Sequence, residues 1–120
     1  MSIYTPDRWV IVKLSGDTVG QPYYRVLGGW FGGYLGSDSW RMNSGITKIT
    51  KTDYGYEIFG ESGSSYQCHT ATERLSNYTA SIFGSLKQQA IDSGKDIKLE
   101  IVNIDTILDQ FMEVENDPQA

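Results

Sequence analysis

Trp9-Val10-Ile11-Val12-Lys13-Leu14 is the stretch on which the prediction of the fold depends. Its β-branched residues predict a buried strand. The next eight residues, 15–22, contain glycine, aspartate and proline and are typical of a turn. Residues 23–27 predict a second strand, so we expect a hairpin with a long connection between its strands.

Three further strands are expected downstream, in residues 46–51, 56–60 and 65–69. They are short and separated by turns, which favours an antiparallel meander. In the first of them, Ile46 and Ile49 do not follow the strict alternation of a regular strand.

The pattern changes after residue 70, where Tyr78, Ile82, Leu86 and Ala90 recur every four residues and predict one apolar helical face. The main helix is expected over about 73–93, with a capping box at residues 70–73 or a cap at Asn77, and Gly94 just after its end. Residues 97–101 alternate and predict a half-buried strand, and Asp105 is expected to cap a short C-terminal helix. The expected fold is α+β, with an antiparallel meander sheet of about five or six strands and one main helix packed on it.

Length and charge limit the classes of protein that fit. With 120 residues the chain is expected to form one domain over 1–113, followed by an acidic, flexible tail over 114–120. The net charge of -5 lies entirely in the last sixteen residues, because the ten acids and ten bases before them cancel. We expect no membrane span, since no apolar run is long enough, no signal peptide, and no general binding of nucleic acid.

The sequence offers little catalytic chemistry. Its one cysteine and one histidine are neighbours, Cys68 and His69, and on a strand their side chains would point to opposite faces. We expect Cys68 in the core and His69 on the surface. Sequence motifs for metal, phosphate-loop or serine chemistry are absent, so we expect no enzyme, no metal and no cofactor, although chemistry by paired carboxylates stays open.

Residues 23–45 are the most unusual part of the chain. Six of the eighteen residues from Tyr23 to Trp40 are aromatic, and glycines separate them. Aromatic faces suit stacking, arginines suit phosphate or carboxylate, and amide or hydroxyl groups suit the edges of a ligand. The candidate ligand-binding residues are Arg25, Trp30, Phe31, Tyr34, Asp38, Trp40, Arg41, Asn43 and Ser44. The alternative is that Trp9, Trp30 and Trp40 fill the core over a bent sheet and that Arg25 and Arg41 pair with Asp7 or Asp38.

The run Asp38-Ser39-Trp40-Arg41-Met42-Asn43-Ser44-Gly45, together with residues 7–12, 24–35 and 66–69, resembles a family of small proteins encoded by tailed bacteriophages. The resemblance covers about the first seventy residues and implies expression in the cytoplasm of a bacterial host. Many such phage proteins counter host defence. The chain is similar, in its size and its lack of catalytic residues, to the nucleotide sponges, which bind cyclic oligonucleotides or cyclic ADP-ribose without cleaving them.

The leading hypothesis is therefore a non-enzymatic protein that sequesters a small, anionic, nucleotide-like immune signal, as a homo-oligomer whose subunits together form the site. A second hypothesis is an inhibitor that binds a host protein through its aromatic patch or its acidic tail. A third is an accessory protein of the virion.

Overall fold

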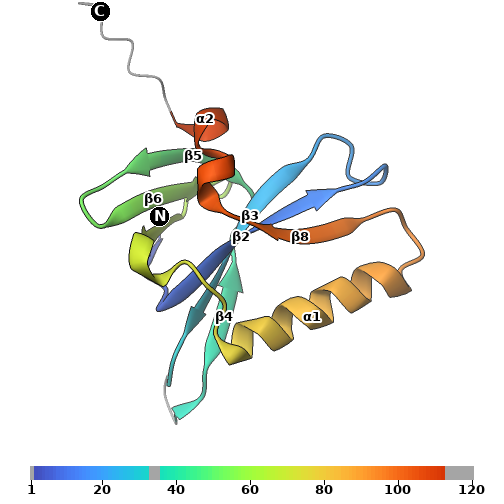
Figure 1. Cartoon of the computed structure of the whole chain (residues 1–120), viewed down its shortest axis with the longest axis horizontal. Helices are drawn as coiled ribbons and strands as arrows, with labels where there is room; N and C mark the ends of the chain where they lie inside the picture. The colour runs from blue at the N-terminus through green and yellow to red at the C-terminus, as the bar shows by residue number, and fades with distance from the viewer. Residues whose placement is uncertain (1, 33–35, 113–120) are drawn as a thin grey trace, which may run out of the picture.

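The computed structural model describes residues 2–32 and 36–112 of the chain (Figure 1). Its strands are β1 (Ile3–Tyr4), β2 (Arg8–Ser15), β3 (Tyr23–Trp30), β4 (Ser39–Met42), β5 (Ile46–Lys51), β6 (Gly55–Gly60), β7 (Ser65–His69) and β8 (Lys98–Val102). Its helices are α1 (Asn77–Asp92), α2 (Leu108–Phe111) and two short 3₁₀ turns, η2 (Thr70–Thr72) and η3 (Ile104–Thr106). The α+β class and the short C-terminal helix are confirmed. Within the described ranges no helix is long and apolar enough to cross a membrane.

The expected single meander of five or six strands was wrong, because the described strands form two sheets of four. Their orders are β1-β7-β6-β5 and β4-β3-β2-β8, and β1 pairs with β7 in parallel. The predicted hairpin of β2 and β3 is confirmed. The chain leaves the second sheet after β4, at residues 43–45, where Gly45 has a φ of +140°. This turn divides the expected meander, since β5, β6 and β7 continue it in the other sheet.

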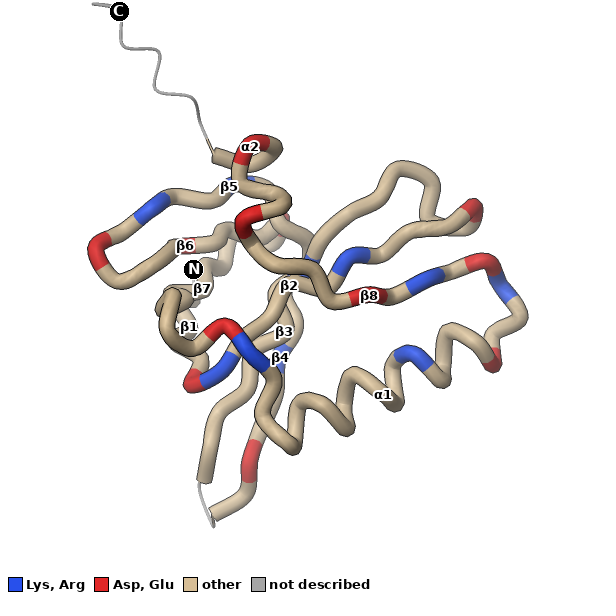
Figure 2. Tube along the Cα trace, viewed as in Figure 1, with Lys and Arg blue, Asp and Glu red and all other residues tan. Residues whose placement is uncertain are grey.

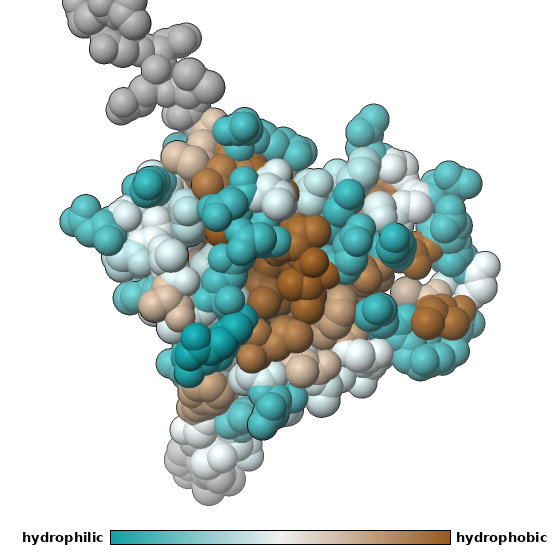
Figure 3. All heavy atoms as spheres, in the orientation of Figure 1, coloured by the Kyte–Doolittle hydropathy of each residue, from teal (hydrophilic) through white to brown (hydrophobic). Residues whose placement is uncertain are grey.

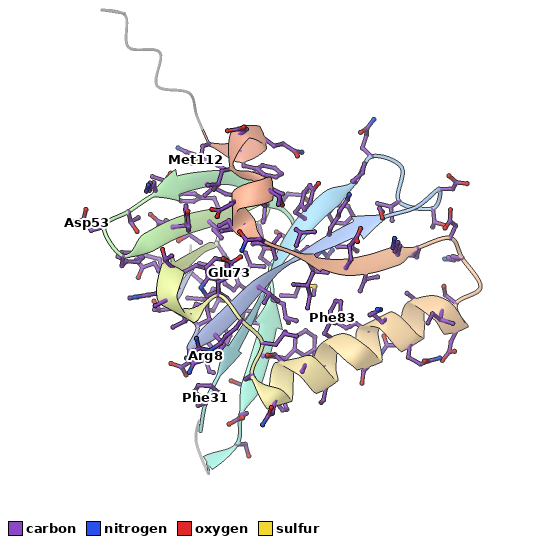
Figure 4. All side chains as sticks on the ribbon, viewed as in Figure 1. Arg8, Phe31, Asp53, Glu73, Phe83 and Met112 are labelled. Atoms are coloured by element: carbon purple, nitrogen blue, oxygen red, sulfur yellow. The ribbon has the colours of Figure 1, made fainter. Side chains whose placement is uncertain are left out.

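The two faces of β2 are both buried, which explains its continuous apolar run. Trp9 and Ile11 belong to the core shared by the two sheets, whereas Val10 and Val12 pack on the opposite face with side chains of α1. Phe83 points from α1 toward this second face (Figure 4). The sheet that contains β2 therefore lies between the other sheet and the main helix (Figure 1).

Helix α1 begins at Asn77, four residues later than expected. Ser76 caps it: Ser76 Oγ accepts from the Thr79 N–H at 3.0 Å, and the Ser76 N–H donates to Thr79 Oγ1 at 2.8 Å. Neither of the two expected caps is used, because Glu73 is held in an extended segment. Its backbone bridges to Trp9, and its carboxylate accepts from the Ile104 N–H at 2.7 Å.

Three smaller expectations concern Gly94, Asp105 and the irregular strand. Gly94 follows α1 with a φ of +70°, as expected for the residue after a helix. Asp105 does not cap the C-terminal helix: α2 begins after Ile107 without a side-chain cap, and Asp105 lies in the turn η3, where its N–H donates to Asn103 Oδ1 at 2.9 Å. The broken alternation of β5 has a structural cause, because its register against β6 shifts between Ile46 and Lys48. The acidic tail, 114–120, lies outside the described residues.

Candidate anion-binding pocket

A pocket of about 250 Å³ opens at the turn where the chain passes from one sheet to the other. It brings together parts of β1, β3, β4, β7 and the turn between β6 and β7. Its lining residues are Tyr4, Arg25, Arg41, Met42, Asn43, Ser44, Ser62, Ser64 and Tyr66. Four of them, Arg25, Arg41, Asn43 and Ser44, are residues that the sequence analysis proposed as ligand contacts.

Asn43 is nearly buried in the pocket, with 5% of its surface exposed. Its backbone N–H donates to the Val26 carbonyl at 3.1 Å, and its Oδ1 accepts from the Val26 N–H at 2.9 Å. Its side-chain amide nitrogen, Nδ2, is buried and has no partner among the described residues. A Cβ at Gly60 would lie 3.3 Å from this nitrogen, so the glycine leaves it room. One end of Asn43 therefore holds β3, and the other end is an unused donor.

Arg25 provides a second unused donor. Its Nε is buried, and within the described ranges it has no hydrogen-bond partner. Its Nη1 contacts Met42 Sδ at 3.8 Å, and its guanidinium lies 5.4 Å from the centre of the Tyr23 ring. Buried polar groups in proteins are almost always hydrogen-bonded, because an unpaired one is costly. Two unpaired buried donors, on residues that line the same pocket, favour an acceptor from outside the chain.

Arg41 approaches the pocket over an aromatic side chain, with its guanidinium 4.5 Å from the centre of the Tyr4 ring. Tyr4 in turn lies 5.2 Å from Tyr66, measured between ring centroids. Burial raises the pKa of Tyr66 to about 12, while the positive charge of Arg41 acts in the opposite direction. The phenol is therefore neutral at physiological pH and adds no negative charge.

The serines complete the polar lining. Ser44 Oγ accepts from the Ser62 N–H at 3.0 Å, which orients the hydroxyl and leaves its hydrogen for another acceptor. None of the nine lining residues is acidic. The contacts found for Arg25 and Arg41 within residues 2–32 and 36–112 are with aromatic rings and a sulfur atom, not with the Asp7 or Asp38 carboxylates. The pocket thus combines two positive charges with amide and hydroxyl donors, which suits a phosphate or carboxylate group.

The remaining expected ligand contacts lie at the hairpin of β3 and β4. Trp30 Nε1 donates to the Thr5 carbonyl at 2.9 Å, and Asp38 Oδ1 accepts from the Gly32 N–H at 2.9 Å, so both help to hold the chain in place. Phe31 and Trp40 are exposed. Figure 4 shows Phe31 beside Arg8, whose guanidinium lies 5.0 Å from the ring centre. Tyr34 lies outside the described residues.

These hairpin residues do not line the pocket, but one contact connects the two regions. Tyr4, which lines the pocket, meets Trp30 edge to face with ring centroids 6.3 Å apart. The interpretation of the aromatics as core holds for Trp9, which is buried, and fails for Trp40.

Sequence reasoning missed five lining residues: Tyr4, Met42, Ser62, Ser64 and Tyr66. Met42 lies inside residues 23–45, the segment that contains the candidate ligand contacts. Alternation along residues 65–69 could have placed Tyr66 and Cys68 on one face. Nothing in the sequence brings Tyr4 or the serine turn to Arg25. Parallel pairing of β1 with β7 sets Tyr4 beside Tyr66, and the packing of this sheet against the one that contains β3 and β4 brings both to the arginines.

The neighbouring residues Cys68 and His69 are placed as expected. Cys68 is fully buried, and burial raises the pKa of its thiol well above its usual range. His69 is exposed and stacks on Tyr54 with ring centroids 4.7 Å apart. Among the described residues no group of histidines, cysteines and acids could hold a metal ion.

Comparison of the chain with family models, with curated proteins and with solved structures found no match.

Proposed function

We propose that the protein binds a small phosphate-bearing ligand of the nucleotide type in this pocket and sequesters it without chemical change. The observation that carries the proposal is the pair of buried donors without partners, Arg25 Nε and Asn43 Nδ2. They belong to two residues that line one pocket, which Arg41 also lines and to which no carboxylate of the described residues contributes. An oxyanion that accepts from both atoms would satisfy them, and charge-assisted hydrogen bonds are the stronger kind.

The size of the pocket defines which part of the ligand it would hold. Its volume of about 250 Å³ is slightly below the range typical of pockets for whole drug-sized ligands. We therefore place one phosphate and the adjoining sugar inside, and the base outside. The contact of Tyr4 with Trp30 provides an aromatic path from the pocket to the hairpin, where a base could stack.

The biological role that we propose is the one expected from the resemblance to small phage proteins: removal of a cyclic nucleotide or cyclic ADP-ribose signal of host defence. Sequestration requires binding alone, so the role needs neither a metal nor a nucleophile.

Calorimetry with inorganic phosphate, cyclic di- and trinucleotides and cyclic ADP-ribose isomers tests the proposal. We expect at least one of these compounds to bind and to be recovered intact by chromatography. Arg41→Gln should weaken binding by at least about tenfold, since a hydrogen bond to a charged group contributes about 1.5–3 kcal/mol. Arg74→Gln is the matched control, because Arg74 is exposed and outside the pocket. Absence of binding across the whole panel would refute the proposal, as would conversion of a bound compound.

A second candidate function, binding of a host protein, is favoured by the exposure of Phe31 and Trp40 on the same hairpin. Exposed aromatics are typical of interfaces. The double variant Phe31→Ser, Trp40→Ser separates the two functions when binding of inorganic phosphate, which needs no stacked base, is measured beside it: loss of a stoichiometric host partner with unchanged affinity for phosphate supports the protein interface.

A further inference from the structure

The outer edge of β8 is open. β8 is the last strand of the sheet β4-β3-β2-β8, and within residues 2–32 and 36–112 no strand pairs with its other side. Its pairing with β2 is regular from Lys98 to Val102, without a bulge. Proteins usually protect such edges with bulges, prolines or a covering segment, because unpaired backbone groups invite another strand. β8 has no bulge and no proline, and its charged residues are Lys98 and Glu100.

Apolar surface adjoins this edge. Ile101 on β8 is 40% exposed, and Ile91 near the end of α1 is 67% exposed. Ile91 lines a groove with Ile97 and Leu99, and Ile101 lines a second groove with Val10 and Leu75. Figure 3 shows apolar atoms gathered between β8 and α1. A partner at this edge would cover both grooves.

The charges along β8 are complementary to those of a second copy. Figure 2 shows acidic and basic residues alternating along this part of the chain. If two β8 strands pair antiparallel with Leu99 opposite Leu99, each Lys98 lies opposite a Glu100, and each Ile97 lies opposite an Ile101. Directly opposite residues share a face of the sheet, so the register gives two ion pairs on one face and continuous apolar contacts on the other. The apolar face is the face of the sheet on which α1 packs. Two-fold symmetry would bring the exposed Ile91 side chains of the two copies toward one another.

We propose that the protein forms a two-fold symmetric dimer through antiparallel pairing of its β8 strands, centred on Leu99. The sheet β4-β3-β2-β8 of one copy then joins the same sheet of the other copy in one continuous sheet of eight strands, and the two open backbone edges are paired. This interface lies apart from the anion-binding pocket, so it can be correct whether or not the pocket binds a nucleotide.

Sedimentation equilibrium of the full chain, from about 1 to about 200 µM, tests the proposal, because a dimer dissociates on dilution. We expect dimers for the unaltered chain. Lys98→Glu places two acids opposite each other twice per dimer and should weaken association about tenfold or more. Ile101→Lys should weaken it as well. Ile3→Lys is the control: Ile3 is 59% exposed, but it lies on β1 in the other sheet, and its variant should dimerise normally.

A mixing experiment distinguishes the register from a fold defect. Chains with Lys98→Glu and chains with Glu100→Lys should each self-associate more weakly than the unaltered chain, since like charges face each other in both. An equimolar mixture should form a heterodimer, because every opposite pair then joins an acid and a base. Misfolding cannot be corrected by mixing. A monomeric unaltered chain, a dimer that Lys98→Glu does not weaken, or variants that do not associate on mixing would each overturn the proposal.

Discussion

Replacement of Asn43 separates the contribution of this residue to the fold from its contribution to binding. Asn43 Oδ1 accepts the N–H of Val26 at 2.9 Å, and Val26 is fully buried. Asn43→Ala removes this acceptor and leaves a buried N–H without a partner. Such a group costs about 1–3 kcal/mol, so we expect a loss of about 2 kcal/mol of unfolding free energy. For a chain of this length the melting temperature should fall by about 8 °C.

Asn43→Asp is the matched variant. A carboxylate oxygen still accepts from Val26, so the buried N–H keeps its partner, but burial of the new charge is costly. We therefore expect the unfolding free energy at pH 7 to fall, and to recover as the pH is lowered and the carboxyl becomes protonated. The donor Nδ2 is also replaced by an oxygen that repels anions, so this variant should bind no phosphate compound.

Urea denaturation followed by tryptophan fluorescence measures the stability of both variants, and calorimetry measures binding. If Asn43→Ala costs less than about 0.5 kcal/mol, Val26 has another acceptor and the role assigned to Oδ1 is wrong. If Asn43→Asp binds phosphate compounds as well as the unaltered chain does, Nδ2 is not a ligand contact.

Three further predictions concern the helix and its surroundings. Gly29→Ala should destabilise the fold by about 1–3 kcal/mol, because its Cβ would lie 2.5 Å from Thr79 Cγ2, and the double variant Gly29→Ala, Thr79→Ser should recover much of the loss in denaturation curves. Gly84→Ala should act in the opposite direction and stabilise by about 0.5–1 kcal/mol, because nothing lies near its added Cβ on the open side of α1; a lower melting temperature would contradict this. Burial raises the pKa of Glu73; the negative charge of Asp105 raises it further, and the hydrogen bond from the Ile104 N–H acts in the opposite direction. The folded chain therefore holds the Glu73 proton more tightly than the unfolded chain does. The free energy of unfolding should thus fall as the pH rises above the usual pKa range of a glutamate. Glu73→Gln should therefore melt higher than the unaltered chain at pH 7, with a difference that shrinks as the pH is lowered to about 4; a constant difference over this range would refute the assigned protonation.

Much of the local structure could be predicted from the sequence. The strand at Trp9–Leu14, its hairpin partner, the apolar face of α1 and the end of α1 at Gly94 follow from short-range patterns of apolar and glycine residues. The start of α1 could not be predicted in this way. Glu73 has a good helix-start spacing, but its carboxylate binds the backbone of Ile104, thirty-one residues later, and this contact keeps the segment extended.

The sequence predicted four of the nine residues that line the candidate site. Sequence composition identified Arg25, Arg41, Asn43 and Ser44 because donors of this kind suit an anion. It also selected the exposed aromatics of the hairpin, because composition cannot separate side chains that share a segment but point to different places. Tyr4 and Tyr66 were missed, since they come together by the pairing of β1 with β7 and meet the arginines only where the two sheets pack together.

The amino-acid sequence by itself determined the α+β class, the hairpin that organises the second sheet, the burial of Cys68 and the donor-rich residue types of the candidate site. These properties depend on neighbours in the chain, whose periodicity and chemistry can be read directly. Only the tertiary structure decided that the strands divide into two sheets. It also decided that, among residues 2–32 and 36–112, Asn43 and Arg25 keep buried donors without partners and no strand pairs with the outer edge of β8. The physical reason is that hydrogen-bond satisfaction and burial are properties of the packed chain, and a residue's partner can lie far from it in sequence.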